Sequence, residues 1–361
     1  MSIPGGGARG RSMTFDIFVL LVQDAIGTGA IYVLMALGIV LIFNVTRVIF
    51  VSYGDLVAYS ALTLGAFELN RMPGTVWLVL TLAAMAFVIE AASLIRRQQA
   101  RQIPKAFVYW GIIPAIPVAL TFLIGAENLS LPVSILLTIA LVLPLGPLLY
   151  RIVFQPIATA PVLVLLMVAV ALHFAIAGLA LLYFGPEGFR TSAFVSGDVM
   201  IGSFGIPQQL ILIVGAAAVF SAILFLFFQY SLAGKALRAT AINREGARLV
   251  GIWTTRAGAL AFLLAAGIAG VAGVLISPTT TIYYDTGLIV GLKGFVGSVV
   301  GGFVSYPLAA VGAIIIGLIE SFGSFYSSAL KEAIVFAAII PIVLWRWLYV
   351  SAHDADEHEE E

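Results

Sequence analysis

Residues 160–184 read APVLVLLMVAVALHFAIAGLALLYF, and this stretch decides what kind of protein the chain is. Its 25 residues include no Asp, Glu, Lys or Arg, and His173 is the only side chain among them that titrates near neutral pH. A helix of about 20 apolar residues is long enough to cross the hydrocarbon core of a bilayer. The stretch therefore predicts a transmembrane helix.

The composition of the whole chain points the same way. Of its 361 residues, 61% are hydrophobic and 10% are charged, and the mean hydropathy is +1.11. Ordinary soluble domains are about 45–50% apolar and about 25% charged. This excludes a soluble fold, disorder, a coiled coil and a nucleic-acid-binding protein. The formal net charge is zero, and no Cys is present, which excludes disulfides, thiol catalysis and thiolate metal ligands.

Similar stretches recur along the chain and determine the expected fold. We expect an all-α, polytopic transmembrane helical bundle with roughly 10–12 membrane segments over residues 14–350. For the stretches 14–26 and 285–303 two alternatives stay open, a full crossing or a broken or re-entrant element. Residues 1–13 are expected to form a flexible N-terminus and 351–361 an acidic tail. The ten clearest spans are 27–45, 49–69, 76–95, 106–125, 131–150, 160–184, 208–229, 256–277, 307–325 and 332–349.

Basic loops indicate the orientation, because cytoplasmic loops are enriched in Lys and Arg. The loops 96–105 and 230–256 carry four and five basic residues against none and one acidic residue, so both are expected to face the cytoplasm. Arg9 and Arg11 favour a cytoplasmic N-terminus. The positions between the two basic loops alternate in side: Glu127 outside, Arg151 inside and 185–207 outside.

Motifs for catalysis and nucleotide hydrolysis are absent from the sequence. The Gly234-Lys235 pair lacks both the earlier glycine and the following Ser or Thr of a P-loop. Neither H-E-x-x-H nor G-x-S-x-G occurs. We therefore expect that the chain is not an enzyme, holds no metal and has no catalytic residues.

Ionisable residues within apolar spans are candidates for function, because they are costly to place in a membrane. Asp55, with its neighbour Tyr53, and Lys293 and Glu320 are the candidates for a translocation pathway. Pairing between helices would explain the three charged residues equally well, with Lys293 partnered either by Asp55 or by Glu320. For His173 we expect a buried, hydrogen-bonded role.

Glycines recur at helical spacing in two late segments, 267–273 and 287–301. Small residues of this kind let helix backbones approach closely in lipid. Packing alone would account for them, and a role in lining or gating a pathway is the alternative.

The inner loop 230–256 reads YSLAGKALRATAINREGARLVGIWTTR. Apolar and charged residues alternate in it with helical spacing, and Gly251 supplies a stop signal. An amphipathic helix on the cytoplasmic face would form a docking element, and a plain solvated loop is the alternative. The candidate docking residues lie within 235–252 and are Lys235, Arg238, Arg244, Glu245, Ala247 and Gly251.

The segment EGARLVG, Glu245 to Gly251, is similar to the E-A-A-x-x-x-G coupling motif of ABC-importer permeases. With four further regions, the chain resembles the branched-chain amino acid ABC permease family, on its LivH-like side. Those regions are 27–59, 150–187, 256–278 and 291–321.

The resemblance implies a multi-pass permease in the inner membrane of a prokaryote. It also implies four kinds of partner: a second homologous permease, two ATP-binding cassette subunits, a periplasmic or lipid-anchored substrate-binding protein, and membrane lipid. ATP and Mg²⁺ would be bound by the partner ATPases, so this chain would need no cofactor. Branched-chain or other hydrophobic amino acids would be the cargo, moved by alternating access.

Two departures from the family pattern keep alternatives open. Residues 76–130 resemble an inserted helix pair, and SYGD stands where the family usually has AHGE, with Phe50 and Tyr53 also atypical. Urea, short amides or aromatic acids are therefore alternative cargoes. An ion-driven secondary transporter is a further alternative. An intramembrane aspartyl protease is the weakest, because Gly54-Asp55 and Tyr284-Asp285 occur in reversed order for that class.

Overall fold

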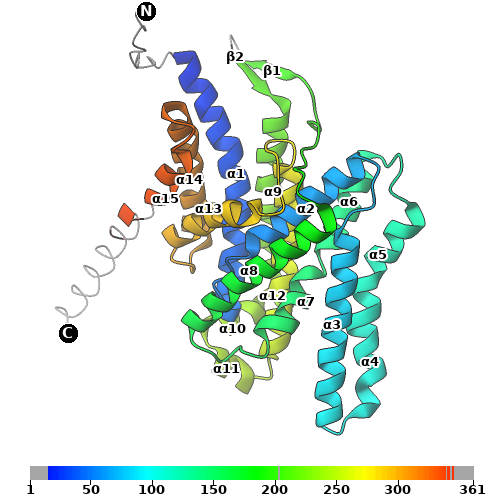
Figure 1. Ribbon diagram of the computed structural model, residues 1–361. Coiled ribbons are helices and arrows are strands. Elements are labelled where there is room, and N and C mark those ends of the chain that lie inside the picture. The colour runs from blue at the N-terminus through cyan, green and yellow to red at the C-terminus, as the bar shows by residue number, and fades with distance from the viewer. Residues whose placement is uncertain (1–14, 202–203, 339, 342–343, 345–361) are drawn as a thin grey trace, which may run out of the picture.

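The computed structural model describes residues 15–201, 204–338, 340–341 and 344 (Figure 1). Helices dominate the fold, which confirms the all-α class. Two short strands, β1 (Asp198–Ile201) and β2 (Phe204–Pro207), pair in an antiparallel hairpin. The segments expected at 1–13 and 351–361 lie outside the described residues.

The helices follow one another in the order α1 (Phe15–Thr46), α2 (Tyr53–Glu68), α3 (Thr75–Arg96), η1 (Ala100–Gln102), α4 (Ile103–Phe107), η2 (Val108–Ile112), α5 (Ile113–Ile124), α6 (Leu131–Val142), α7 (Leu145–Leu149), η3 (Tyr150–Phe154), α8 (Val162–Phe184), α9 (Gln208–Tyr230), α10 (Leu232–Ile242), α11 (Arg244–Leu249), α12 (Thr254–Ile276), α13 (Thr286–Val300), α14 (Tyr306–Tyr326) and α15 (Lys331–Ala337).

Within the described residues, eight helical segments are long and apolar enough to cross a membrane. They are Phe15–Thr46, Thr75–Arg96, Ala100–Ile124, Leu131–Phe154, Val162–Phe184, Gln208–Tyr230, Thr254–Ile276 and Tyr306–Tyr326. This confirms the polytopic bundle. For 14–26 the alternative of a broken or re-entrant element is wrong, because these residues from Phe15 onward continue into 27–45 as one 32-residue helix. Of the predicted span 332–349, α15 and a few further positions are described.

Two helices near the middle of the bundle are too short to cross a bilayer. The 16 residues of α2 and the 15 of α13 reach about 22–24 Å at 1.5 Å per residue, against a core of about 30 Å. The non-helical connection before α2 is buried, with Val48, Phe50 and Ser52 each at most 1% exposed. Irregular backbone is tolerated at membrane depth where protein surrounds it, so α13 is a broken element, one of the alternatives left open for 285–303. The prediction of a full span at 49–69 is wrong, because its first residues are non-helical and α2 is too short to cross.

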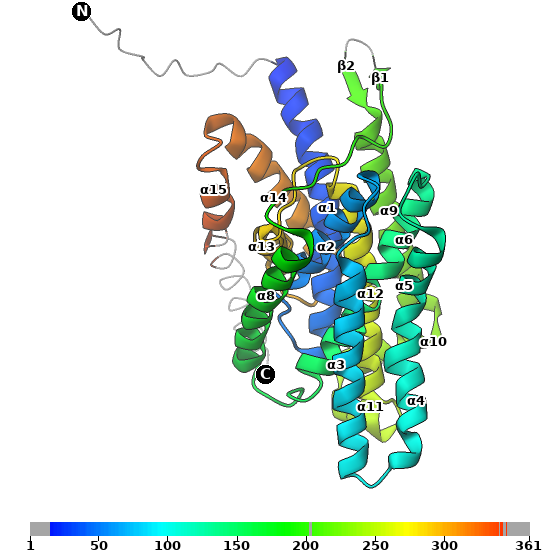
Figure 2. The same ribbon diagram turned by 45° about the vertical axis from the view of Figure 1, so that its right-hand side comes forward.

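A central group of helices holds most of the buried surface. Every residue of α2 from Tyr53 to Phe67 is buried. The helices α1, α12 and α13 pack on α2, and α14 packs on α1 and α13, while α8, α9 and the α3–α5 pair lie farther out (Figures 1 and 2). The pair expected within 76–130 is thus present as α3 and Ala100–Ile124. That it is additional to the usual family length stays a prediction.

Two hydrogen bonds show the direction in which α1 runs. Gln23 Nε2 donates to the Gly205 carbonyl of the hairpin at 3.3 Å, and Arg47 Nη2 donates to the Ala241 carbonyl of α10 at 3.3 Å. With the basic loop 230–256 placed inside, α1 begins on the outer side (Figure 1). This conflicts with the cytoplasmic N-terminus expected from Arg9 and Arg11, which precede the described residues. The larger basic loops carry more of the orientation signal, so we keep the orientation that they give, as a prediction.

The predicted order of loops otherwise matches the fold. Asn128 N donates to Asn70 Oδ1 at 2.8 Å at the outer end, and Arg244 Nη1 donates to the Ala158 carbonyl at 3.2 Å at the inner end. Arg151 is a correction, because it lies in η3, within a helical segment rather than a loop. It is buried there and forms an ion pair with Glu90 of α3. This pairing offsets the energetic cost of placing a charge within an apolar helical segment.

Candidate functional site

The N-terminal turns of α2 and α13 cross in close contact. A Cβ on Gly54 would overlap the Gly287 carbonyl and the Gly291 backbone, and a Cβ on Gly287 would overlap Asp55. Glycine at these positions lets the two backbones touch, as small residues do at membrane helix interfaces. The predicted packing role of the glycines in 287–301 is thus confirmed at this crossing, and their role in gating stays a prediction.

Asp55 lies at this crossing and bonds to a rim helix. His173 Nδ1 of α8 lies 2.8 Å from Asp55 Oδ1 and 3.0 Å from Oδ2, and both residues are at most 4% exposed. The expectation of a buried, hydrogen-bonded His173 is confirmed. The alternative that paired Lys293 with Asp55 is wrong, because the imidazole of His173 on α8 is the partner of the Asp55 carboxylate.

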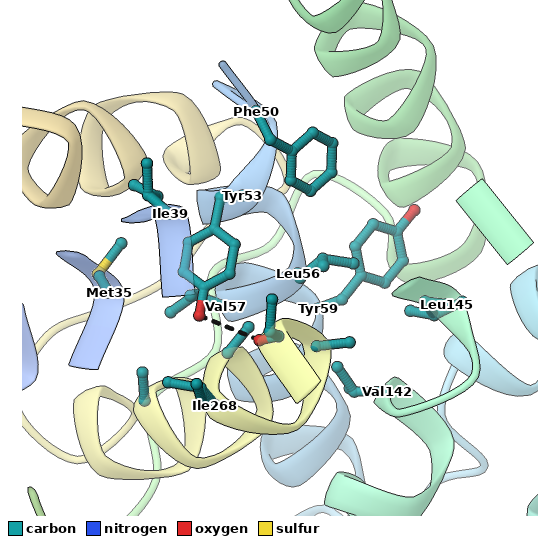
Figure 3. Close-up of a cluster of buried hydrophobic side chains, with 14 of the residues drawn as sticks. Met35, Ile39, Phe50, Tyr53, Leu56, Val57, Tyr59, Val142, Leu145 and Ile268 are labelled. Carbon is teal, nitrogen blue, oxygen red and sulfur yellow. Dashed lines mark hydrogen bonds between the residues drawn. The ribbon is translucent and has the colours of Figure 1, made fainter. Parts of the chain in front are cut away.

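Tyr53 lies in the apolar cluster between α1 and α12 (Figure 3). Its hydroxyl donates to the Ala265 carbonyl at 3.0 Å, and its ring lies where a Cβ on Gly38 would otherwise be. In the same view Ile39 lies beside the ring and Ile268 lies beyond its hydroxyl end. In this conformation Tyr53 closes the space between three helices.

Glu320 of α14 is the centre of a second polar cluster. Lys293 Nζ of α13 lies 2.5 Å from its Oε1, and the Tyr32 hydroxyl of α1 donates to its Oε2 at 2.6 Å. Lys331 Nζ of α15 lies 3.9 Å from Oε1. The alternative that paired Lys293 with Glu320 is thereby confirmed. Tyr32 and Lys331 were missed, since nothing in their local sequence marks them as partners.

The four pathway candidates therefore fall into three environments. Asp55 pairs with His173, Lys293 pairs with Glu320, and Tyr53 lies among apolar side chains. A cavity of about 1100 Å³ elsewhere in the molecule is lined by none of them. Their role in a pathway stays a prediction.

At the inner end, the loop 230–256 folds into two short helices with sequence-encoded starts. Ser231 Oγ accepts from Gly234 N at 2.8 Å and caps α10, and Asn243 Oδ1 accepts from Gly246 N at 2.8 Å and caps α11. Such caps satisfy otherwise unpaired N–H groups. Gly251 follows α11 with a φ of +86°, as its stop signal predicts. The plain solvated loop is thus excluded.

Side-chain contacts tie this helix pair to three other parts of the bundle. Arg47 at the end of α1 bonds to α10, Arg244 bonds to Ala158 in the loop before α8, and Arg248 Nε donates to Thr254 Oγ1 of α12 at 3.2 Å. Ala247 is buried against the protein, whereas Lys235, Arg238, Glu245 and Gly251 are exposed. A force applied to α10 and α11 would reach all three parts.

Besides these charged residues, large apolar residues of α10, α11 and the stretch up to α12 are exposed, which the sequence reasoning did not single out. We call this patch the coupling surface, and its large residues are 67–89% exposed. They are Leu232, Ile242, Leu249, Val250 and Trp253. Their signal in the sequence was the presence of large apolar residues inside a basic, polar loop. Such a patch rimmed by charge is typical of a protein–protein contact.

The described part of the chain contains no cluster of three or more His, Cys, Asp or Glu side chains that could hold a metal ion. The protease alternative would need two carboxylates sharing a proton. Asp55 instead faces an imidazole, which disfavours that chemistry.

Comparison with known proteins identifies relatives. The family described as the permease component of the branched-chain amino acid transport system matches residues 21–344. The high-affinity branched-chain amino acid transport system permease protein LivH of Escherichia coli (strain K12) is 30% identical over 203 residues, 54% of this chain and 65% of LivH. LivH of Salmonella typhimurium gives the same figures.

BraD of Pseudomonas aeruginosa, a protein with the same description, is 32% identical over 155 residues, 42% of this chain and 50% of BraD. The chain thus spans 65% of the length of LivH and half of BraD. No solved structure matches it. The family match covers most of the chain and includes the short central helices and the coupling surface, so the chain belongs to the family of branched-chain amino acid transport permeases.

Proposed function

We propose that the chain is a membrane-spanning permease subunit of an ATP-binding cassette importer. It would form the translocation pathway, together with a second homologous permease. Family membership, the names of LivH and BraD, and the eight candidate spans support this role. Two ATPase subunits would bind ATP and Mg²⁺ and dock on the inner face, and a substrate-binding protein would deliver cargo to the outer face.

The coupling surface is the observation that carries this proposal. Leu249 is 89% exposed, Ile242 is 85% exposed, and both stand on short capped helices fastened to α1 and α12. An ordered apolar patch at the inner end of the bundle is costly in water unless a partner covers it. ATPase subunits that close on ATP would use such a patch to switch the helices between outward and inward access.

Within the bundle, α2 and α13 are the elements best suited to move. They are short, they cross through glycine contacts, and each carries one member of a polar pair between helices, Asp55 or Lys293. Broken helices of this kind form the sites of other transporters. Opening of the pathway would move the α2–α13 crossing away from the apolar cluster around Tyr53. In the present conformation the two are packed together.

Branched-chain or other hydrophobic amino acids are the proposed cargo, in line with the names of the relatives. Urea, short amides or aromatic acids are the second proposal. They are favoured by one observation, which is that Asp55 and His173 place two polar groups at the start of α2. A transport panel with the cognate binding protein separates the two proposals.

The docking role can be tested in proteoliposomes that contain the chain and its co-purified partners. We expect Leu249→Asp to abolish co-purification of the ATPase subunits and ATP-driven uptake, because a charge would face the apolar contact. Replacing Glu245 with Ala and Gly251 with Asn together should uncouple uptake from ATP. Both variants should remain monodisperse, since Leu249 and Glu245 are exposed and Asn tolerates the positive φ of position 251.

The matched control replaces Arg97 and Arg101, two exposed residues of the other inner loop, with Ala. This control should retain partners and uptake. Wild-type uptake in Leu249→Asp would refute the docking role. Uptake that survives without any ATPase and collapses with a protonophore would instead establish a secondary transporter.

A further inference from the structure

A cavity of about 1100 Å³ opens between the α3–α5 helix pair and the start of α12. Its walls are the inner half of α3, the segment from Gln102 to Leu120, the α6–η3 segment and the residues from Thr255 to Leu263. None of the pathway candidates or coupling-surface residues lines it. The proposed transport function therefore leaves this cavity without a role.

The inner end of the cavity is polar and positively charged. Three cationic side chains line it, Lys105, Arg151 and Arg256, against a single carboxylate, Glu90. The guanidinium of Arg256 also lies 4.8 Å from the centre of the Trp253 ring, which holds it beside the cavity mouth. An anion at this end would meet a net positive charge.

Arg151 has donor capacity that the described protein does not use. It is 9% exposed, and its Nη2 is occupied by the ion pair with Glu90. Its Nε is buried and has no hydrogen-bond partner in the described part of the chain. A buried guanidinium N–H without a partner is costly, so a ligand oxygen in the cavity would satisfy a group that the protein leaves open.

The deeper part of the cavity is apolar and opens toward the lipid. Ile113 and Ile116 of α5 line it and are 48% and 50% exposed. Leu120 lies 15 residues beyond Lys105 on the same helical segment, about 22 Å along its axis. This distance exceeds the thickness of half a bilayer core, about 15 Å, so the cavity matches an elongated amphiphile rather than a compact solute.

Both helical walls deviate from regular α-helix where they face the cavity. η2 (Val108–Ile112) and η3 (Tyr150–Phe154) are π-helical turns, and they carry the lining residues Tyr109, Trp110 and Arg151. π-turns are rare and occur frequently at functional sites. Two of them on facing walls indicate a built site rather than a packing gap.

We propose that this cavity binds one anionic phospholipid from the inner leaflet. The phosphate would lie among Lys105, Arg151 and Arg256, and one acyl chain would run along Ile113 and Ile116. Basic pockets between transmembrane helices on the cytoplasmic side favour anionic headgroups. The aromatic pair Tyr109 and Trp110 would lie near the headgroup level, where such rings are preferred. The bound lipid would join the α3–α5 pair to α12.

Native mass spectrometry of the full chain, purified with its partners, tests this proposal. The probes are phosphatidylglycerol and phosphatidylcholine with identical acyl chains. We expect one phosphatidylglycerol to be retained tightly per chain. In a variant with Lys105→Gln and Arg256→Gln, its affinity should fall about thirtyfold, the equivalent of about 2 kcal/mol for two removed cations.

The matched control carries Arg97→Gln and Arg101→Gln, which removes the same charge from the same side but lies outside the cavity. Its affinity for phosphatidylglycerol should be unchanged. Equal retention of the two lipids by the unmodified protein would overturn the proposal. Equal loss in both variants would overturn it as well, because it would show general attraction to a basic surface.

A second measurement does not depend on how the variants fold. Phosphatidylglycerol with a photoreactive acyl chain should crosslink the unmodified protein mainly at α5 and the first half of α12. Crosslinks spread evenly over exposed rim positions such as Phe225 and Leu226 of α9 would show annular lipid only, and would refute a defined site.

Discussion

The helices α12 and α9 have the same length, 23 residues, and both could span a membrane, but they occupy opposite environments. The mean hydropathy of the most apolar window is 2.5 in α12 and 2.9 in α9. Yet 72% of that window is buried in α12 and 17% in α9. The more hydrophobic helix lies at the rim, so hydropathy identifies the spans without indicating which of them form the core.

Small residues and polar contacts distinguish the two helices. A Cβ on Gly273 of α12 would overlap the Val57 carbonyl and Ser60, whereas one on Gly215 of α9 would meet no atom within 4 Å. Lipid tails are as apolar as Leu, so helix association in a membrane depends on close packing and hydrogen bonds. The core is therefore where backbones touch and polar groups pair, and each prediction below compares a core position with a rim position.

The largest effect is expected for Lys293→Met in the core. The substitution removes the partner 2.5 Å from Glu320 and leaves a buried carboxylate, at a cost of about 3–5 kcal/mol. Lys331→Met is the control, because its ammonium is 3.9 Å from the same carboxylate and its side chain is 40% exposed. It should cost less than about 1 kcal/mol.

Apparent melting temperatures in detergent would measure both variants. A drop of equal size in the two would contradict the assignment of Lys293 as the buried partner. Restored stability in a double variant, Lys293→Met with Glu320→Gln, would sharpen it.

A smaller loss is expected for His173→Leu, which tests how a rim helix is held to the core. The change leaves Asp55 without its bonds of 2.8 and 3.0 Å, at about 1–3 kcal/mol for an unsatisfied buried group. Phe174→Leu is the matched control, since the neighbouring side chain is 66% exposed. A double-mutant cycle with Asp55→Asn would measure the coupling, and additive effects would show that the two residues do not interact.

The glycine comparison predicts effects of opposite sign. Gly273→Ala should destabilise the protein by about 1–3 kcal/mol, because the added methyl group has no space in the core. Gly215→Ala should be neutral or stabilising by up to about 1 kcal/mol, since Ala favours helix and its Cβ has open space. Thermal unfolding of the two variants side by side is the measurement, and a loss in both would refute packing as the difference.

Sequence reasoning succeeded where the signal was local and failed where it depended on distant residues. Apolar length predicted most of the spans, and helical spacing predicted helix within 230–256, where the structure has α10 and α11. The Asp55–His173 pair joins positions 118 residues apart, so only the packing of α8 reveals it. The exposure of Leu249 and Val250 was missed for the same reason, because an apolar residue in a loop shows its environment only in three dimensions.

The smallest effect is expected for single hydroxyl groups, and it makes the comparison most demanding. Ser60 Oγ of α2 donates to the Gly270 carbonyl of α12 at 2.6 Å, whereas Ser221 Oγ of α9 is buried and has no partner in the described part of the chain. Hydrogen bonds between membrane helices contribute about 0.6 kcal/mol on average.

Ser60→Ala should therefore lower stability by about that amount, and Ser221→Ala should leave it unchanged or raise it slightly, because it removes an unsatisfied group. Replicate unfolding curves in the same detergent can resolve the sign. Since both changes remove one oxygen from a helix residue, a difference between them reports the partner alone. If Ser221→Ala proves as damaging as Ser60→Ala, polar pairing does not separate core from rim, and close glycine packing would carry that distinction by itself.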